Sequence, residues 1–182
     1  WLESSLPALM LVVCVVDIVL PGSGLAATLA AAAALLHGIR LSGWAGARTL
    51  DQPIVWALHL AYLWLPLGFL LKTIALFSGA AWAQSWQHAF GIGVFAGMIV
   101  AVSTRAALGH TGRPLVVHRF IAWAYALVSL AALLRVATPL LTSENYFQGL
   151  LAVAACWVSA FILFLIVYGP ILICPRADGK PG

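Results

Sequence analysis

Five histidines are the side chains in this sequence best suited to binding a metal. They stand at wide and irregular intervals: His37, His59, His88, His110 and His118. A neutral imidazole binds haem iron, copper and zinc well, and histidines on facing helices can hold a haem between them. No HxH, HExxH or CxxC spacing selects one metal. Taken singly, each histidine is also compatible with an ordinary role as a hydrogen-bonded residue at the membrane interface. The pattern alone therefore leaves the kind of site open.

The most polar passage of the chain is residues 103–119, STRAALGHTGRPLVVHR. It contains three arginines and two of the five histidines. Such a passage is typical of a loop between buried helices, and it is equally a place where a binding site would lie. The elements around it have to be established before either interpretation is preferred.

The composition indicates a membrane protein, because 64% of the residues are hydrophobic and 8% are charged. A soluble domain cannot hide so much apolar surface, since roughly 55–60% of any folded surface is apolar already. A helix that crosses ~30 Å of hydrocarbon needs about 20 mostly apolar residues. The apolar runs do not alternate as barrel strands do, so we predict an all-α, polytopic helical bundle. The six predicted spans are Leu6–Leu20, Leu25–Gly38, Pro53–Phe77, His88–Ala107, Phe120–Leu141 and Leu150–Ile173.

The basic residues predict the orientation of these spans. Only Lys72 and Arg135 fall on one side of the membrane. The other side carries Arg40, Arg48, Arg105, Arg113, Arg119, Arg176 and Lys180. Cytoplasmic loops carry the excess of Lys and Arg, so we predict that the 105–119 loop and the C-terminus are cytoplasmic. The cations are scattered over several loops and form no patch beside stacking aromatics, which argues against a nucleic-acid partner.

The spans assign a depth to each histidine. His59 lies six residues after Pro53, hence roughly 9 Å into its helix. His37 ends the second span on the same side, at a depth where it is expected to converge with His59. His118 opens the fifth span and His110 lies in the loop before it. His88 lies near the opposite face without a histidine partner.

Two further features bear on packing. Asp17 is the only acid well inside a predicted span, so we expect it to face the bundle interior in an ion pair, with Lys72 or Arg135 as the available cations. In the fourth span a small residue recurs every fourth position: Ala89, Gly93, Gly97 and Ala101. This ridge predicts a close helix–helix crossing. The glycines beside His88 are also compatible with room for a flat macrocycle.

Several motifs together closely resemble the C-terminal half of the NnrS family. The stretch LGHTGRP, residues 108–114, is the most specific of them. The others are Arg40-x-x-x-Trp44, Pro53-x-x-x-x-x-His59-x-x-Tyr62, His88-Ala89-Phe90-x-x-Gly93 and Thr104-Arg105. The tail, from Tyr168-x-Pro170 through Pro175-Arg176-x-Asp178-Gly179-Lys180 to Gly182, looks like the end of the same family. The resemblance extends from about Leu25 to Gly182.

The resemblance implies a bacterial inner-membrane protein that contains haem and copper and is linked to nitric oxide metabolism and to protection from nitrosative stress. Family members are about twice this length, with about twelve spans of ~20 residues each. We therefore expect residues 1–182 to form one transmembrane domain, the C-terminal half of such a protein, with the N-terminal half, the lipid bilayer and nitric oxide or a related small molecule as partners.

On this basis we assign candidate roles to the motif residues. His59 and His88 are candidate metal ligands completed by groups from the N-terminal half, with His37 and His118 as further candidates. Arg105 and Arg113 are candidates for holding haem propionates, because a guanidinium matches a carboxylate bidentately. His110 is a candidate ligand or gate at the cytoplasmic mouth. The same arginines are equally compatible with binding lipid headgroups.

Two other classes of function remain open at this point. A membrane transporter or metal-handling protein without redox turnover would suit the short spans around residues 21–24 and the intramembrane Asp17. A structural or regulatory subunit would use its histidines only for hydrogen bonds.

Overall fold

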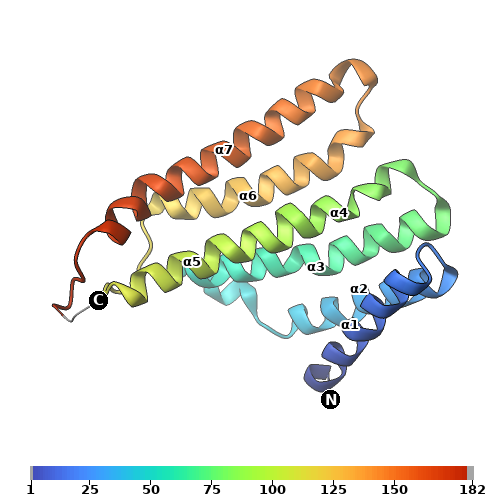
Figure 1. Ribbon diagram of the computed structural model, residues 1–182, viewed down its shortest axis with the longest axis horizontal. Helices are drawn as coiled ribbons and strands as arrows, with labels where there is room; N and C mark the ends of the chain where they lie inside the picture. The colour runs from blue at the N-terminus through green and yellow to red at the C-terminus, as the bar shows by residue number, and fades with distance from the viewer. Residues whose placement is uncertain (1, 180–182) are drawn as a thin grey trace.

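Six helical segments of the chain are long and apolar enough to cross a membrane. They are seen in a computed structural model that describes residues 2–179 (Figure 1). Lys180, which the charge count above includes, and the last two residues of the tail motif lie outside the described residues. The prediction of an all-α membrane bundle with six spans is confirmed. The spans run over Leu2–Val19, Gly24–Ser42, Pro53–Ser78, Ala81–His110, Arg119–Leu140 and Ser143–Ile173.

Four of the spans are single helices and two are composite. The single helices are α1 (Leu2–Val19), α2 (Gly24–Ser42), α3 (Pro53–Ser78) and α7 (Ser143–Ile173). The fourth span joins η2 (Ala81–Ser85), α4 (Trp86–His88), the π-helical η3 (Ala89–Ala96) and α5 (Gly97–His110). The fifth joins α6 (Arg119–Ala137) and η4 (Thr138–Leu140), and a short η1 (Gly46–Thr49) lies between α2 and α3.

Local chemistry explains where several helices begin and end. The Ser23 side chain caps α2 by accepting a hydrogen bond from the Ala26 amide at 3.1 Å. Pro53 opens α3 at a position where its missing amide proton is not needed. Gly79 ends α3 with φ +67°, a left-handed conformation that glycine adopts without steric cost.

The predicted boundaries were wrong at two helix starts. The fourth span begins at Ala81 because the 3-10 turn that opens it is packed inside the bundle, with Ala83 fully buried. The last helix begins at Ser143 rather than Leu150, and its polar first turns are exposed. Hydropathy marks the part of a helix that lies in hydrocarbon, whereas the helix itself continues into the interface. The acidic Glu144 favours the helix N-terminus at this point.

The helices alternate in direction, which separates the bundle into two ends (Figure 1). The α2–α3 and α5–α6 connections and the C-terminal tail lie at one end, which we call the charged end. The α1–α2, α3–η2 and α6–α7 connections lie at the opposite end. Most arginines are at the charged end, as the orientation argument requires. Assigning that end to the cytoplasm stays a prediction.

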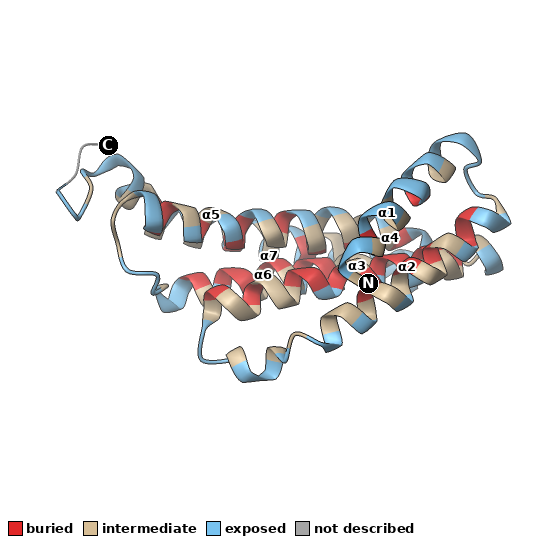
Figure 2. Ribbon diagram, turned by 90° about the horizontal axis from the view of Figure 1, so that it is seen from below, coloured by how far each residue is buried: buried red, intermediate tan, exposed pale blue. Residues whose placement is uncertain are grey.

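Helix α3 is the centre of the packing, because it contacts α2, η3, α5 and α6. Buried residues line the helices where they face one another, and exposed residues dominate the tail and loops (Figure 2). Helix α1 packs mainly on α2, and α7 packs mainly on α6, at the two edges of the bundle (Figure 1). The two edge helices therefore present most of their surface outward.

The small-residue ridge forms the predicted crossing. A Cβ on Gly93 would lie 2.2 Å from Cγ of Trp64, and one on Gly97 would lie 2.9 Å from Cβ of Ala61. Helix α3 thus fills the space beside both glycines. Gly91 faces outward, with no atom within 4 Å of where its Cβ would be. Any room for a flat ring next to His88 is therefore on the outer side of η3.

The predicted ion pair of Asp17 is also confirmed. Its carboxylate accepts a hydrogen bond from Lys72 Nζ, which joins α1 to α3 near the opposite end of the bundle. Lys72 is buried, with 4% of its surface exposed. A buried ammonium needs such a partner, because an unpaired charge in a dry interior is costly.

Candidate functional site at the charged end of the bundle

His37, near the end of α2, is the most enclosed of the five histidines, with 4% of its surface exposed. Its Nδ1 lies 2.6 Å from Oη of Tyr62 on α3. Its Nε2 lies 3.4 Å from Sδ of Met10 on α1. Its ring lies parallel to that of Phe69, with centroids 6.1 Å apart. Three helices therefore meet around one imidazole inside the membrane-spanning region.

Arg40 and Glu3 extend the hydrogen bonds around His37. Its Nη1 donates to Tyr62 Oη at 3.2 Å, and its Nε donates to the Glu3 carboxylate at 2.7 Å. A guanidinium can only donate, so Tyr62 accepts from Arg40 and has its own hydroxyl proton available for His37 Nδ1. A neutral His37 then carries its proton on Nε2, directed at the Met10 thioether. If the Tyr62 hydroxyl rotates and accepts a hydrogen bond from Nδ1 instead, His37 carries its proton on Nδ1. The lone pair of Nε2 then faces the Met10 sulfur.

We call these five residues, Glu3, Met10, His37, Arg40 and Tyr62, the His37 cluster. It is anchored at the outside by the Glu3–Arg40 ion pair and ends at the half-buried Met10 thioether. The sequence indicated His37 as a candidate ligand but did not indicate Met10. A single methionine in an apolar helix is ordinarily a packing residue, so no signal singled it out.

His59 joins the same region through ring contacts. The ring of Trp44, which follows α2, has its centroid 4.5 Å from that of Tyr62 and 5.4 Å from that of His59. Thr49 Oγ1 lies 3.4 Å from His59 Nδ1. The structure thus brings His37 and His59 into one neighbourhood, as their depths predict, and links them through Trp44 and Tyr62.

The other three histidines lie elsewhere. His88 is half-buried at the end of α4, at the opposite end of the bundle. His110 is exposed at the end of α5. His118 caps α6, where its Nδ1 accepts a hydrogen bond from the Phe120 amide at 3.2 Å. Within residues 2–179, no three His, Cys, Asp or Glu side chains gather closely enough to hold a metal ion.

A groove of about 630 Å³ at the charged end, which we call the Arg105 groove, runs between the start of α3 and the start of α6. Arg105 and Arg119 line it together with Asp51 and apolar side chains of residues 53–55 and 115–117. Among the ion pairs of residues 2–179, none includes Arg105 or Arg119. Two guanidinium groups are therefore available to an anionic ligand. The sequence predicted Arg105 here but missed Arg119 and Asp51.

Arg113 does not line this groove. Its backbone amide donates to Leu108 O at 2.9 Å, and its Nη1 lies 3.5 Å from Thr111 O, so it helps to close the turn after α5. Arg105 and His110 also line a smaller hollow of about 330 Å³ on the outer side of α5. The basic side chains of residues 103–119 thus lie in three different places, the Arg105 groove, the smaller hollow and the turn after α5.

The C-terminal tail folds back onto the turn that follows α5. Arg176 Nη1 donates to His110 O at 2.7 Å, and the Ala177 amide donates to Thr111 O at 2.9 Å. The Arg176 guanidinium donates hydrogen bonds to the Asp178 carboxylate, which raises the pKa of this guanidinium above its usual value, so the cation stays charged. We call this contact the tail clasp. It brings together LGHTGRP and the tail motif, which are 62 positions apart between Pro114 and Arg176.

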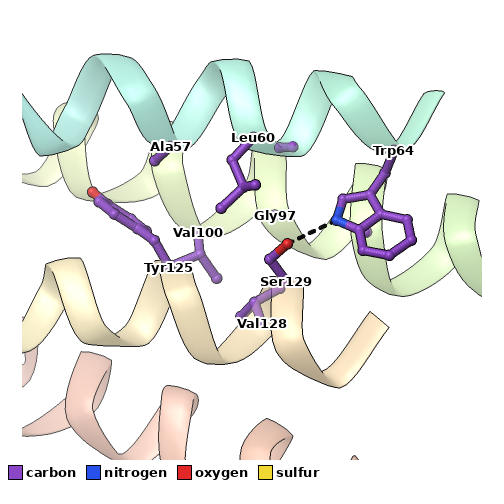
Figure 3. Close-up of a pocket in the computed structure, with 10 residues that line it drawn as sticks. Ala57, Leu60, Trp64, Gly97, Val100, Tyr125, Val128 and Ser129 are labelled. Atoms are coloured by element: carbon purple, nitrogen blue, oxygen red, sulfur yellow. Dashed lines mark hydrogen bonds between the residues drawn. The ribbon is translucent and has the colours of Figure 1, made fainter. Parts of the chain in front are cut away.

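The centre of the bundle is packed rather than hollow. A cavity of about 10 Å³ remains between α3, α5 and α6, which is space for about one water (Figure 3). Trp64 reaches across it, and its Nε1 donates to Ser129 Oγ at 2.9 Å (Figure 3). A cofactor the size of a haem therefore has no place between these three helices.

Replacing Gly112 by alanine is expected to open the tail clasp. Gly112 has φ +68°, and a Cβ there would lie 2.4 Å from Cγ of Asp178. The substitution combines backbone strain with a clash against the tail. We expect faster tryptic cleavage after Arg176, followed by mass spectrometry of the released peptide.

The matched control for this prediction is Gly109→Ala. Gly109 lies three residues earlier, has an ordinary helical φ and has no atom within 4 Å of its Cβ position. This variant should be cleaved at the wild-type rate. Equal cleavage of both variants would show that the clasp does not protect the tail.

Comparison with known proteins identifies the family to which this arrangement belongs. No match was found among curated proteins or among solved structures. A family model described as NnrS protein matches residues 1–176, which include the His37 cluster, the Arg105 groove and the LGHTGRP turn. The chain therefore belongs to the NnrS family.

Proposed function

We propose that this protein binds haem and copper and takes part in nitric oxide metabolism and in protection from nitrosative stress. Membership of the NnrS family supports a role related to nitric oxide, and the six spans make it a multi-pass membrane protein. We further propose the bacterial inner membrane as its location, with the charged end in the cytoplasm. The excess of arginines at that end supports this orientation.

The observation that carries the proposal is the pair of soft donors inside the His37 cluster. Imidazole nitrogen and thioether sulfur together suit copper, in particular Cu(I). His37 Nε2 and Met10 Sδ already face each other at 3.4 Å. Metal ligation needs the lone pair of Nε2, which the rotated Tyr62 hydroxyl would provide by accepting from Nδ1. Tyr62 and Arg40 would then orient the ligand from behind, as second partners of metal-bound histidines do.

Haem is better accommodated at the Arg105 groove than inside the bundle. The groove has about 630 Å³, against about 10 Å³ at the centre. Arg105 and Arg119 would hold the propionates through bidentate hydrogen bonds. His118 lies between two residues that line the groove, which makes it the nearest candidate axial ligand. A bound haem iron with an open position would supply the place where nitric oxide binds.

The remaining ligands are proposed to come from a further membrane-spanning half of the same protein. One imidazole and one thioether are few donors for a metal, and residues 2–179 hold no group of three or more His, Cys, Asp and Glu side chains that could bind one. His59 at the charged end and His88 at the opposite end stay candidates for separate sites that such a half would complete. Arg113 and His110 stay candidates beside the tail clasp.

A transporter or metal-handling protein without redox turnover is the second candidate. Its support in the sequence was the short spans around residues 21–24 and the intramembrane acid Asp17. The structure pairs this carboxylate with Lys72, so it is not an uncompensated charge available to a passing cation. This observation favours the haem and copper proposal.

The proposal is tested on the purified full-length protein by its optical spectrum together with metal analysis. We expect a haem Soret band and bound copper, and the absence of both would refute the proposal. His37→Ala and His118→Ala variants, which remove the proposed copper ligand and the proposed haem ligand, then separate the classes of function. Loss of haem or copper supports the redox proposal, whereas lost transport with metal retained supports a transporter.

A further inference from the structure

A second cavity, of about 410 Å³, lies at the end of the bundle away from the Arg105 groove. It is bounded by α1, α3 and the α4–η3 segment. Cys14 and Phe95, on opposite walls, are exposed, so the cavity opens sideways toward the region that lipid would occupy. Its volume falls within the range of small-molecule sites, about 300–1,000 Å³. We call it the Lys72 cavity.

The polar part of this cavity is the Asp17–Lys72 pair. Lys72 Nζ donates to one carboxylate oxygen of Asp17, and an ammonium has three protons to donate. The second carboxylate oxygen of Asp17 has no hydrogen-bond partner among the described residues, and 35% of the Asp17 side chain is exposed. The pair therefore offers a ligand both a hydrogen-bond donor and a hydrogen-bond acceptor, with no net charge.

The apolar part of the cavity is largely aromatic. The rings of Phe69 and Phe90 meet edge to face at 4.9 Å, and those of Trp86 and Phe90 do so at 5.7 Å. Lys72 Nζ lies 5.0 Å from the centroid of the Trp86 ring. A planar ring entering from the lipid would find aromatic faces for stacking and two polar groups at their edge.

We propose that the Lys72 cavity binds the ring of a membrane-soluble quinone. A quinone carbonyl accepts a hydrogen bond from Lys72, and the hydroxyl of the reduced form donates to Asp17. The isoprenoid chain leaves through the lateral opening between Cys14 and Phe95. Lys72 lies six residues before the end of α3, hence roughly 9 Å below that end, a depth that a lipid-anchored ring reaches.

Charge complementarity distinguishes this ligand from an anionic phospholipid. An anionic headgroup needs a net positive site, and here Asp17 already neutralises Lys72. A lone acyl chain would leave both polar groups unused. Met10 of the His37 cluster also lines the cavity. The quinone contacts proposed here are to Asp17 and Lys72, so quinone binding does not depend on haem or copper and is tested separately from the proposed function.

The test is photoaffinity labelling of the full-length protein in lipid nanodiscs with a photoreactive azidoquinone. We expect labelled residues within 10–17 or 86–95, and we expect excess unlabelled quinone to suppress the labelling. Suppression by phosphatidylglycerol but not by quinone would identify a lipid site and overturn the proposal. Metal analysis of the same sample reports on haem and copper independently.

The variant for this test replaces both charges at once, as Asp17→Leu with Lys72→Met. Replacing a buried ion pair by apolar residues of similar volume is often neutral for folding, whereas removing one partner leaves a buried charge. Because hydrogen bonds to charged groups are lost, quinone labelling should fall about tenfold. Arg135→Met is the matched control, since it removes a cation from the same end outside the cavity. Wild-type labelling in the double variant would contradict the proposal.

Discussion

His37→Ala is expected to lower the Cu(I) affinity of the purified full-length protein by more than about a hundredfold, because loss of a group that merely orients a ligand already costs about 10–100-fold. The substitution removes the only imidazole that faces the Met10 thioether within residues 2–179. It also removes the hydrogen-bond partner of the Tyr62 hydroxyl on the His37 side. The measurement is an anaerobic competition against a coloured Cu(I) chelator.

Two further variants separate ligation from folding. His110→Ala removes an exposed imidazole at the same end of the bundle and should keep the wild-type affinity. Tyr62→Phe keeps the ring that packs against Trp44 and removes only the hydroxyl behind His37, so its affinity should fall between the two. Equal affinities for His37→Ala and His110→Ala would refute copper ligation by the His37 cluster.

The fold of this protein was largely predictable because lipid imposes simple rules. Hydropathy located all six spans. The scarcity of charge predicted an ion pair of Asp17 with Lys72 or Arg135, and the four-residue spacing of small side chains predicted a close helix–helix crossing in the fourth span. Each of these predictions depends either on the sequence of a single helix or on a charge for which the chain offers few opposite charges. Helix ends were harder, because they lie in the interface, where hydropathy does not distinguish helix from loop.

The candidate site was less predictable because it depends on register between helices. Met10 contacts His37 only because the α1–α2 hairpin places the two residues at the same depth in the bundle. No periodic pattern in α1 distinguishes position 10 from its neighbours. Arg119 reaches the Arg105 groove only because α6 starts beside α3. The sequence also placed LGHTGRP and the tail motif in separate segments. Their meeting in the tail clasp requires α5 and α7 to end at the same side of the bundle.

Gly93→Ala is expected to destabilise the protein by about 1–3 kcal/mol, as overpacking in a well-packed interior typically does. Without a clash, the same change would stabilise a helix by about 1 kcal/mol, since alanine is the better helix former. The sign of the effect therefore reports the clash. Thermal unfolding of the purified protein in detergent, monitored by tryptophan fluorescence or by loss of the monodisperse chromatographic peak, measures it.

The physical reason for the large effect is that no side-chain rotation relieves the contact. A Cβ on Gly93 would lie 2.2 Å from Cγ and 2.6 Å from Cβ of Trp64. The position of the Trp64 Cβ is set by the backbone of α3, so rotation of the side chain does not move it. The indole of Trp64 is also fixed by the hydrogen bond that its Nε1 donates to Oγ of Ser129 on α6. Helices α3 and η3 would have to move apart, which disturbs the packing around the buried Lys72 as well.

Gly91→Ala is the matched control, since it changes the same π-helical segment two residues away. Gly91 is exposed, and a Cβ there meets no atom within 4 Å. The control should be neutral or slightly stabilising, because only the helix propensity changes. If both variants were destabilised equally, the effect would belong to the π-helical backbone and not to the crossing. A difference between them would establish that Gly93 is glycine because Trp64 occupies the space beside it.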